Sequence, residues 1–188
     1  KFSSSLKEIH TYSFCGCSSL TEISIPTSVK SIESYAFSEC SSLKKITLPS
    51  SITRINEFTF SKCSSLEQIK MSSKVSYIAE GAFSGCEKLA EFKLPTSITF
   101  IAEETFSNCS SLKTINIQES IDTIKDKAFN GCSSIKELVI PVTVKSIGNE
   151  SFANCSSLEK ITINPFITSI EDDTFSSCSS VKSLVIGN

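Results

Sequence analysis

Cysteine recurs along this chain with a period of 23 residues and without a single insertion. Eight of the nine cysteines keep this spacing, and the 188 residues hold a little over eight copies of the unit. Self-similarity at a fixed period of about 20 to 50 residues is typical of solenoids, in which each copy buries its apolar face against its neighbours. The period therefore predicts one elongated domain over residues 1–188. The periodic cysteines are Cys17, Cys40, Cys63, Cys86, Cys109, Cys132, Cys155 and Cys178.

The chain starts and stops inside a repeat. Phe2 falls 23 residues before Ile25, and only Gly187 and Asn188 follow the last apolar run. Solenoids normally carry atypical end repeats that cover their terminal faces. We therefore expect this single domain of about eight repeats to be a piece of a longer protein and to lack caps.

Apolar columns in the aligned copies indicate which positions are buried. A leucine, isoleucine or valine follows each periodic cysteine by three residues, and alternation across Ile46, Thr47 and Leu48 predicts a strand with one buried face. Pro49 ends this strand because proline cannot extend a hydrogen-bonded ladder. One such strand per copy, always in the same direction, predicts a parallel sheet of about eight strands. Phenylalanine precedes every periodic cysteine by three residues, at Phe14, Phe37, Phe60, Phe83, Phe106, Phe129, Phe152 and Phe175.

Two further segments complete the unit. An apolar pair three residues apart, such as Ile52 and Ile55, fits a short extended or 3₁₀ segment on the opposite wall. The residue before the cysteine is often glycine or asparagine, which favours a left-handed backbone there. Glu39, Lys62 and Ser177 occupy this position without carrying that signal. The copies that carry it have Gly16, Gly85, Asn108, Gly131 and Asn154.

The pattern Leu-x-x-Ile-x-Leu-Pro-x-x-Ile-x-x-Ile-x-x-x-x-Phe-x-x-Cys, read from residues 43–63, resembles the 23-residue leucine-rich repeat of the BspA-like family of microbial proteins. The resemblance implies a right-handed leucine-rich-repeat solenoid with a parallel β-sheet on the concave face and short extended or 3₁₀ segments on the convex face. It also implies a non-enzymatic protein of the cell surface, or a secreted one, that binds host matrix or cell-surface proteins. No binding residue of the family can be carried over to this chain.

The cysteines leave three chemistries to weigh: disulfides, a metal site or a packed column. Equivalent residues in a parallel stack lie about 5 Å apart and point the same way, whereas a disulfide needs converging Cβ atoms and zinc needs four tetrahedral ligands. We expect a ladder of buried free thiols, with no metal and no cofactor. Cys15 stands outside the ladder where most copies have serine, so we expect it to be the most accessible thiol. It is our candidate reactive thiol, either a neutral replacement of serine or the site of an intermolecular disulfide.

The remaining composition argues against several functional classes. His10 is the single histidine, expected in a solvated loop, and no glycine-rich phosphate cradle is present, so we predict no enzymatic activity. The net charge of −2 argues against nucleic-acid binding, and no apolar stretch is long enough to span a membrane. The resemblance favours the cell surface or secretion. A cytoplasmic location is the alternative, because reduced thiols are usual inside cells and the N-terminus lacks a signal peptide.

Outward columns that vary between copies are the candidate partner-binding surface. On the predicted sheet, three such columns contain eight lysines and five glutamates, a balance of +3. These side chains either solvate the strand face or form a polar groove for a protein segment. Tyr77 and Phe100 are aromatic where later copies have serine or threonine, so they either contact a partner or pack against the adjoining loop. Self-association through these aromatics or end to end is a further expectation. The sheet-face candidates are Lys45, Lys70, Lys93, Asn116, Glu91 and Glu137.

Overall fold

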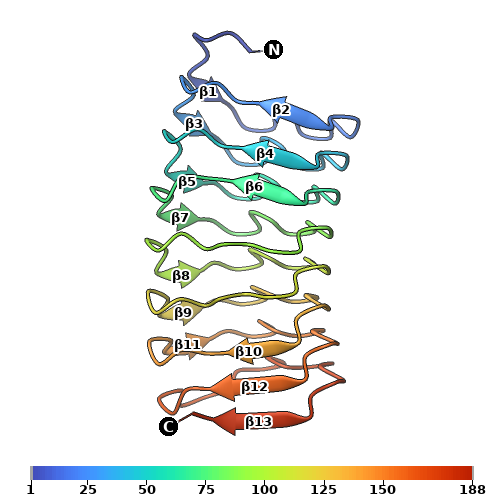
Figure 1. Ribbon diagram of the computed structural model, residues 1–188, viewed down its shortest axis with the longest axis vertical. Helices are drawn as coiled ribbons and strands as arrows, with labels where there is room; N and C mark the ends of the chain where they lie inside the picture. Colours follow the sequence, from blue (N-terminus) through green and yellow to red (C-terminus); the bar gives the residue numbers. More distant parts are fainter. Residues whose placement is uncertain (1, 188) are drawn as a thin grey trace.

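The computed structural model of the protein describes residues 2–187, which wind into a stack of parallel-stranded coils (Figure 1). We number the coils 1 to 8 by their phenylalanines, from Phe14 in coil 1 to Phe175 in coil 8. The described residues form short strands and turns and contain no helix. The N-terminus and the C-terminus lie at opposite ends of the stack. The predicted solenoid of about eight repeats is confirmed.

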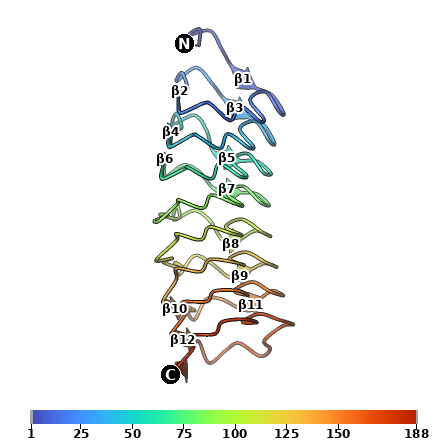
Figure 2. The same ribbon diagram turned by 90° about the vertical axis from the view of Figure 1, so that its right-hand side faces the viewer.

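The strands form two walls on different sides of the coils (Figure 2). Each strand pairs in parallel with its counterpart 23 residues away, as in Ile23 with Ile46 and Ile46 with Ile69. The short-strand wall consists of β1 (Glu8–Ile9), β3 (Ser31–Ile32), β5 (Arg54–Ile55), β7 (Tyr77–Ile78), β8 (Phe100–Ile101), β9 (Thr123–Ile124) and β11 (Ser146–Ile147). The long-strand wall consists of β2 (Glu22–Ser24), β4 (Lys45–Thr47), β6 (Gln68–Lys70), β10 (Glu137–Val139), β12 (Lys160–Ile163) and β13 (Ser183–Ile186).

The long-strand wall is not one continuous sheet. It forms two three-stranded sheets, β2-β4-β6 and β10-β12-β13, and a single bridge between Glu91 and Thr114 links coils 4 and 5 between them. The prediction of one continuous sheet of about eight strands is therefore wrong, because the strands of this wall form two separate sheets. The apolar pairs of the opposite wall are extended rather than 3₁₀. Placement of the long-strand wall on the concave side stays a prediction.

A column of stacked aromatic rings fills the interior. The phenylalanines of successive coils lie with ring centroids 5.2–5.8 Å apart and ring planes within 6–12° of each other. The six from Phe37 to Phe152 are fully buried, whereas Phe14 and Phe175 at the two ends are half-buried. Each offset-stacked pair contributes about 0.5–1.5 kcal/mol beyond the burial of its area.

A second column, the thiol ladder, hydrogen-bonds neighbouring coils. The Sγ of each ladder cysteine from Cys40 to Cys178 donates to the carbonyl oxygen of the phenylalanine 26 residues earlier, at 3.1–3.4 Å. Cys63, Cys86 and Cys109 are among the residues with no exposed surface. The expected ladder of buried free thiols is confirmed from Cys40 to Cys155.

The turn around each phenylalanine forms a backbone ladder that crosses every junction between coils. At each of the seven junctions three amides donate to carbonyls of the next coil at 2.6–3.3 Å. Between coils 4 and 5 the donors are Gly81, Phe83 and Gly85, although no strand pairing joins β7 to β8 there. We call this set of hydrogen bonds the turn ladder. The turn ladder holds neighbouring coils together at the junctions where one strand wall or the other is interrupted.

Left-handed residues shape the turn ladder. The position before each periodic cysteine has positive φ in all eight coils, including Glu39, Lys62 and Ser177, so that prediction holds beyond the copies that carry glycine or asparagine. A second left-handed column, which was not predicted, lies two residues before each phenylalanine and includes Tyr35 and Lys127. Positive φ is costly for bulky residues. Bulky residues of these columns keep a positive φ because the amides on either side of the phenylalanine must both face the next coil.

Candidate functional site

The long-strand wall presents the predicted partner-binding residues to solvent. The eight lysines of its three outward columns are all exposed. With the five glutamates of the same columns they give this face a net charge of +3, whereas the net charge of the whole chain is −2. Lys182 pairs with Glu159 at 2.8 Å and lowers the pKa of that carboxyl group. The other lysines of these columns make no ion pair within residues 2–187.

Three adjoining hollows form a central groove across coils 3 to 6 of this wall. Their volumes are about 700, 540 and 750 Å³, and all three are lined by Glu91 and Lys93. Lys70 lines the first two, and Asn116 and Glu137 line the third. The structure thus brings five of the six predicted sheet-face residues together. Lys45 lies apart, in a hollow of about 470 Å³ over coils 1 and 2.

Phe92 explains why the groove lies where it does. It takes the position that isoleucine or leucine takes in the strands of other coils, and its ring packs 4.9 Å from Phe83 and 4.7 Å from Phe106. We attribute the interrupted ladder to this ring, because an oversized core side chain displaces its own main chain. Within residues 2–187 the amides of Leu94 and Ile117 donate to no neighbouring coil, whereas their counterpart Leu48 donates to Lys70 at 2.8 Å.

Coil 4 therefore contains site features that the sequence analysis missed. Phe92 is one, and Lys88 is the other: it lines the groove in a column that is serine in the other seven coils. The signal that could have revealed both residues was a departure from their own columns. Phe92 was hidden because phenylalanine suits a buried strand position.

The aromatic pair is on the short-strand wall, and its ring faces are covered by the protein's own cations. Arg54 lies 4.1 Å above the Tyr77 ring and the ammonium group of Lys125 lies 5.2 Å from the centre of the Phe100 ring. The two aromatic rings meet edge to face at 5.7 Å, and both residues are half-buried. Cation–π contacts of this kind stabilise the wall. The arrangement supports the packing alternative for this pair.

Two thiols lie at the surface of coil 1. Cys17 is exposed and Cys15 is half-buried, so the expectation that Cys15 is the most accessible thiol is wrong. The reactivity of Cys15 stays a prediction. Within residues 2–187 no three histidine, cysteine or acidic side chains are placed to hold a metal ion.

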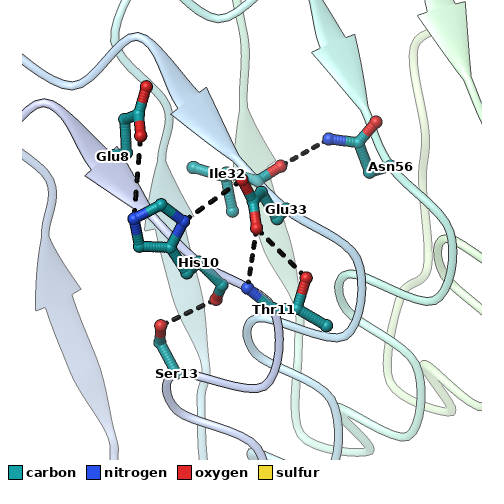
Figure 3. Close-up of polar contacts among 7 residues, drawn as sticks. All are labelled: Glu8, His10, Thr11, Ser13, Ile32, Glu33 and Asn56. Carbon is teal, nitrogen blue, oxygen red and sulfur yellow. Dashed lines mark hydrogen bonds and ion pairs between the residues drawn. The ribbon is translucent and has the colours of Figure 1, made fainter.

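His10 lies in an exposed polar cluster at the start of the short-strand wall (Figure 3). Its Nδ1 is 3.2 Å from Glu33 Oε1 and its Nε2 is 3.6 Å from Glu8 Oε2. The backbone amide of Thr11 donates to Glu33, and this bond together with those from His10 and the Thr11 hydroxyl lowers the pKa of the Glu33 carboxyl group. The Ser13 hydroxyl donates to the backbone oxygen of His10 rather than to the imidazole. The cluster is a hydrogen-bonded surface network without a nucleophile on the ring.

Repeated parallel coils, a phenylalanine column and an exposed strand face define the class of leucine-rich-repeat solenoids. The model of the BspA type leucine rich repeat region matches residues 1–113 and 99–188, in six copies. The chain therefore belongs to the BspA-type leucine-rich-repeat family. No curated protein sequence matches it.

Solved structures of leucine-rich repeat proteins resemble the chain. A leucine-rich repeat protein from Bacteroides ovatus shares 26% identity with a TM-score of 0.74, over 99% of this chain and 54% of that protein. The T. pallidum leucine rich repeat protein shares 26% identity with a TM-score of 0.53, over 88% of this chain and 66% of that protein. The chain thus spans about half the length of the first protein. Over residues 2–187 it contains no helix long and apolar enough to cross a membrane.

Proposed function

We propose that the chain is a non-enzymatic adhesion and protein-binding solenoid of a microbial surface or secreted protein. In this proposal the long-strand wall binds host matrix or cell-surface proteins. The observation that carries it is the central groove, because it gathers exposed charged and amide side chains on the long-strand wall. Membership of a family of leucine-rich repeats supports a role in protein interaction.

Binding to immobilised host matrix proteins and to intact host cells tests the proposal. We expect at least one matrix protein to bind, and the double variant Asn116→Arg/Glu137→Arg to weaken binding about tenfold by altering the groove. Lys145→Glu, an exposed change outside the long-strand wall, is the control and should leave binding unchanged. The proposal would be wrong if neither the full-length parent protein nor this chain bound any of the matrix proteins or host cells.

An intracellular interaction scaffold is the second candidate. It is favoured by the nine free cysteines, since reduced thiols persist most readily inside cells. Localising the full-length protein in its own cell separates the two functions: surface labelling of intact cells supports adhesion, and exclusively internal staining supports the scaffold.

A further inference from the structure

An apolar hollow lies in the middle of the long-strand wall, between coils 3 and 4. Its volume is about 540 Å³ and its lining includes Ile69, Met71, Phe92 and Leu94. Hollows of about 300–1,000 Å³ are the size that accepts a small ligand or a few side chains. This one is distinct from the exposed apolar surface at the two ends of the stack. We call it the Met71 hollow.

The Met71 hollow exists because no strand pairing joins coils 3 and 4 on this wall. Ile69 and Met71 are half-buried, whereas their counterparts in coil 2, Ile46 and Leu48, are only 2% and 5% exposed. The ladder ends at β6, so no strand of coil 4 covers these two side chains. Apolar surface is thus left open to solvent at a site where the repeat would ordinarily bury it.

Two lysines stand at the rim of the hollow. Lys70 and Lys93 occupy the same outward column in successive coils, and both are exposed. Neither pairs with a carboxylate within residues 2–187. Glu91 also lines the hollow, so the charges at its rim sum to +1. Adjacent, unpaired ammonium groups complement a carboxylate.

We propose that the Met71 hollow binds an extended peptide segment of a protein partner that carries an apolar side chain and a carboxylate two residues apart. In an extended segment, residues two apart point to the same side. The apolar side chain enters the hollow between Met71 and Phe92, and the carboxylate meets Lys70 and Lys93. The inference rests on the proposed protein-binding function and specifies the chemistry of the partner.

Titrating the ¹⁵N-labelled chain with defined peptides tests this inference. The probe is a capped serine–glycine peptide with one leucine and one glutamate two residues apart, added to about 5 mM so that millimolar Kd values are detected. We expect amide shifts at Lys70, Met71 and Lys93. Replacing the glutamate by glutamine, or placing it next to the leucine, should weaken binding about fivefold or more.

Matched variants test whether the peptide-induced amide shifts arise from binding in the Met71 hollow. Lys70→Glu/Lys93→Glu should abolish binding, whereas Lys44→Glu/Lys113→Glu makes the same charge change on the same wall outside the hollow and should not. Equal loss in both double variants overturns the inference, as does the absence of shifts at the hollow. Shifts that a heparin disaccharide reproduces and that ignore the leucine would also overturn it. Matrix binding that survives Lys70→Glu/Lys93→Glu would refute this site alone and leave the proposed function standing.

Discussion

The ladder cysteines from Cys40 to Cys132 carry protonated thiols because burial raises the pKa of each, and their titration couples to folding. Burial raises the pKa of the Cys109 thiol to about 12, from an ordinary value of 9.0. Between these two pH values the folded chain keeps the proton and the unfolded chain releases it. The unfolding free energy therefore falls as pH rises above about 9, by about 1.4 kcal/mol per pH unit for each such thiol.

We expect Cys109→Ala to flatten this alkaline decline. At pH 7.5 the variant should lose about 1–2 kcal/mol, because the sulfur fills a fully buried site and donates to Phe83 at 3.2 Å. Between pH 9 and 10.5 its unfolding free energy should fall less steeply than that of the wild type, by about 1.4 kcal/mol per pH unit. Urea unfolding at several pH values measures both quantities. Parallel slopes would show that the thiol ionises equally in both states.

Glycines before the ladder cysteines allow a second prediction about single residues. Gly85 has a φ of +75°, and an added Cβ would lie 3.3 Å from Cα of Lys62, whereas Gly16 has a φ of +72° and nothing within 4 Å. Alanine at either position takes on the left-handed strain of about 1–2 kcal/mol, but at Gly85 it also presses on the neighbouring coil. Gly85→Ala should therefore destabilise the chain more than Gly16→Ala in thermal and urea unfolding. Equal losses of stability in the two variants would show that only the left-handed backbone strain, and not contact with the neighbouring coil, destabilises Gly85→Ala.

Among the elements, those repeated in every copy could be predicted from the sequence. The columns of phenylalanine, cysteine and leucine predicted the buried side chains and the strand, and the glycines and asparagines before the cysteines predicted the first left-handed position. The second left-handed column could not be predicted, because Tyr35 and Lys127 hold positive φ through hydrogen bonds to the next coil rather than through their own preference. The groove was missed for a similar reason. Phe92 fits a buried strand by type, and only the structure shows its ring packed against two others where the ladder is interrupted.

Amide hydrogen exchange can compare strands that occupy the same column. The amides of Leu48 and Ile140 each donate to the next coil at 2.8 Å, whereas those of Leu94 and Ile117 donate to no neighbouring coil. We expect Leu94 and Ile117 to exchange faster than Leu48 and Ile140, since unbonded amides are protected by burial alone. The turn-ladder amide of Phe83, in the same coil as Leu94, should remain slow. Uniform protection across the four strand positions would mean that the long-strand wall is continuous in solution.

At the scale of the whole molecule, the turn ladder, the phenylalanine column and the thiol ladder run through the junctions that the two strand walls leave open. Each coil is therefore stabilised mainly by its two neighbours. The end coils show the consequence. In coil 8 the amides of Asp173, Phe175 and Ser177 donate to no other backbone group among residues 2–187, and Leu184 and Ile186 of β13 are 61% and 68% exposed.

These ends predict head-to-tail association of the 188-residue chain. Light scattering should give an apparent mass that rises with protein concentration, because unpaired amides, a free strand edge and apolar side chains meet in one face. Leu184→Lys/Ile186→Lys should return the chain to the monomer, since burying two lysines at the junction is unfavourable. Tyr77→Ser/Phe100→Ser should not, because Arg54 and Lys125 already cover those rings. The reverse pattern would move the contact to the short-strand wall, and a concentration-independent monomer mass would rule out both routes.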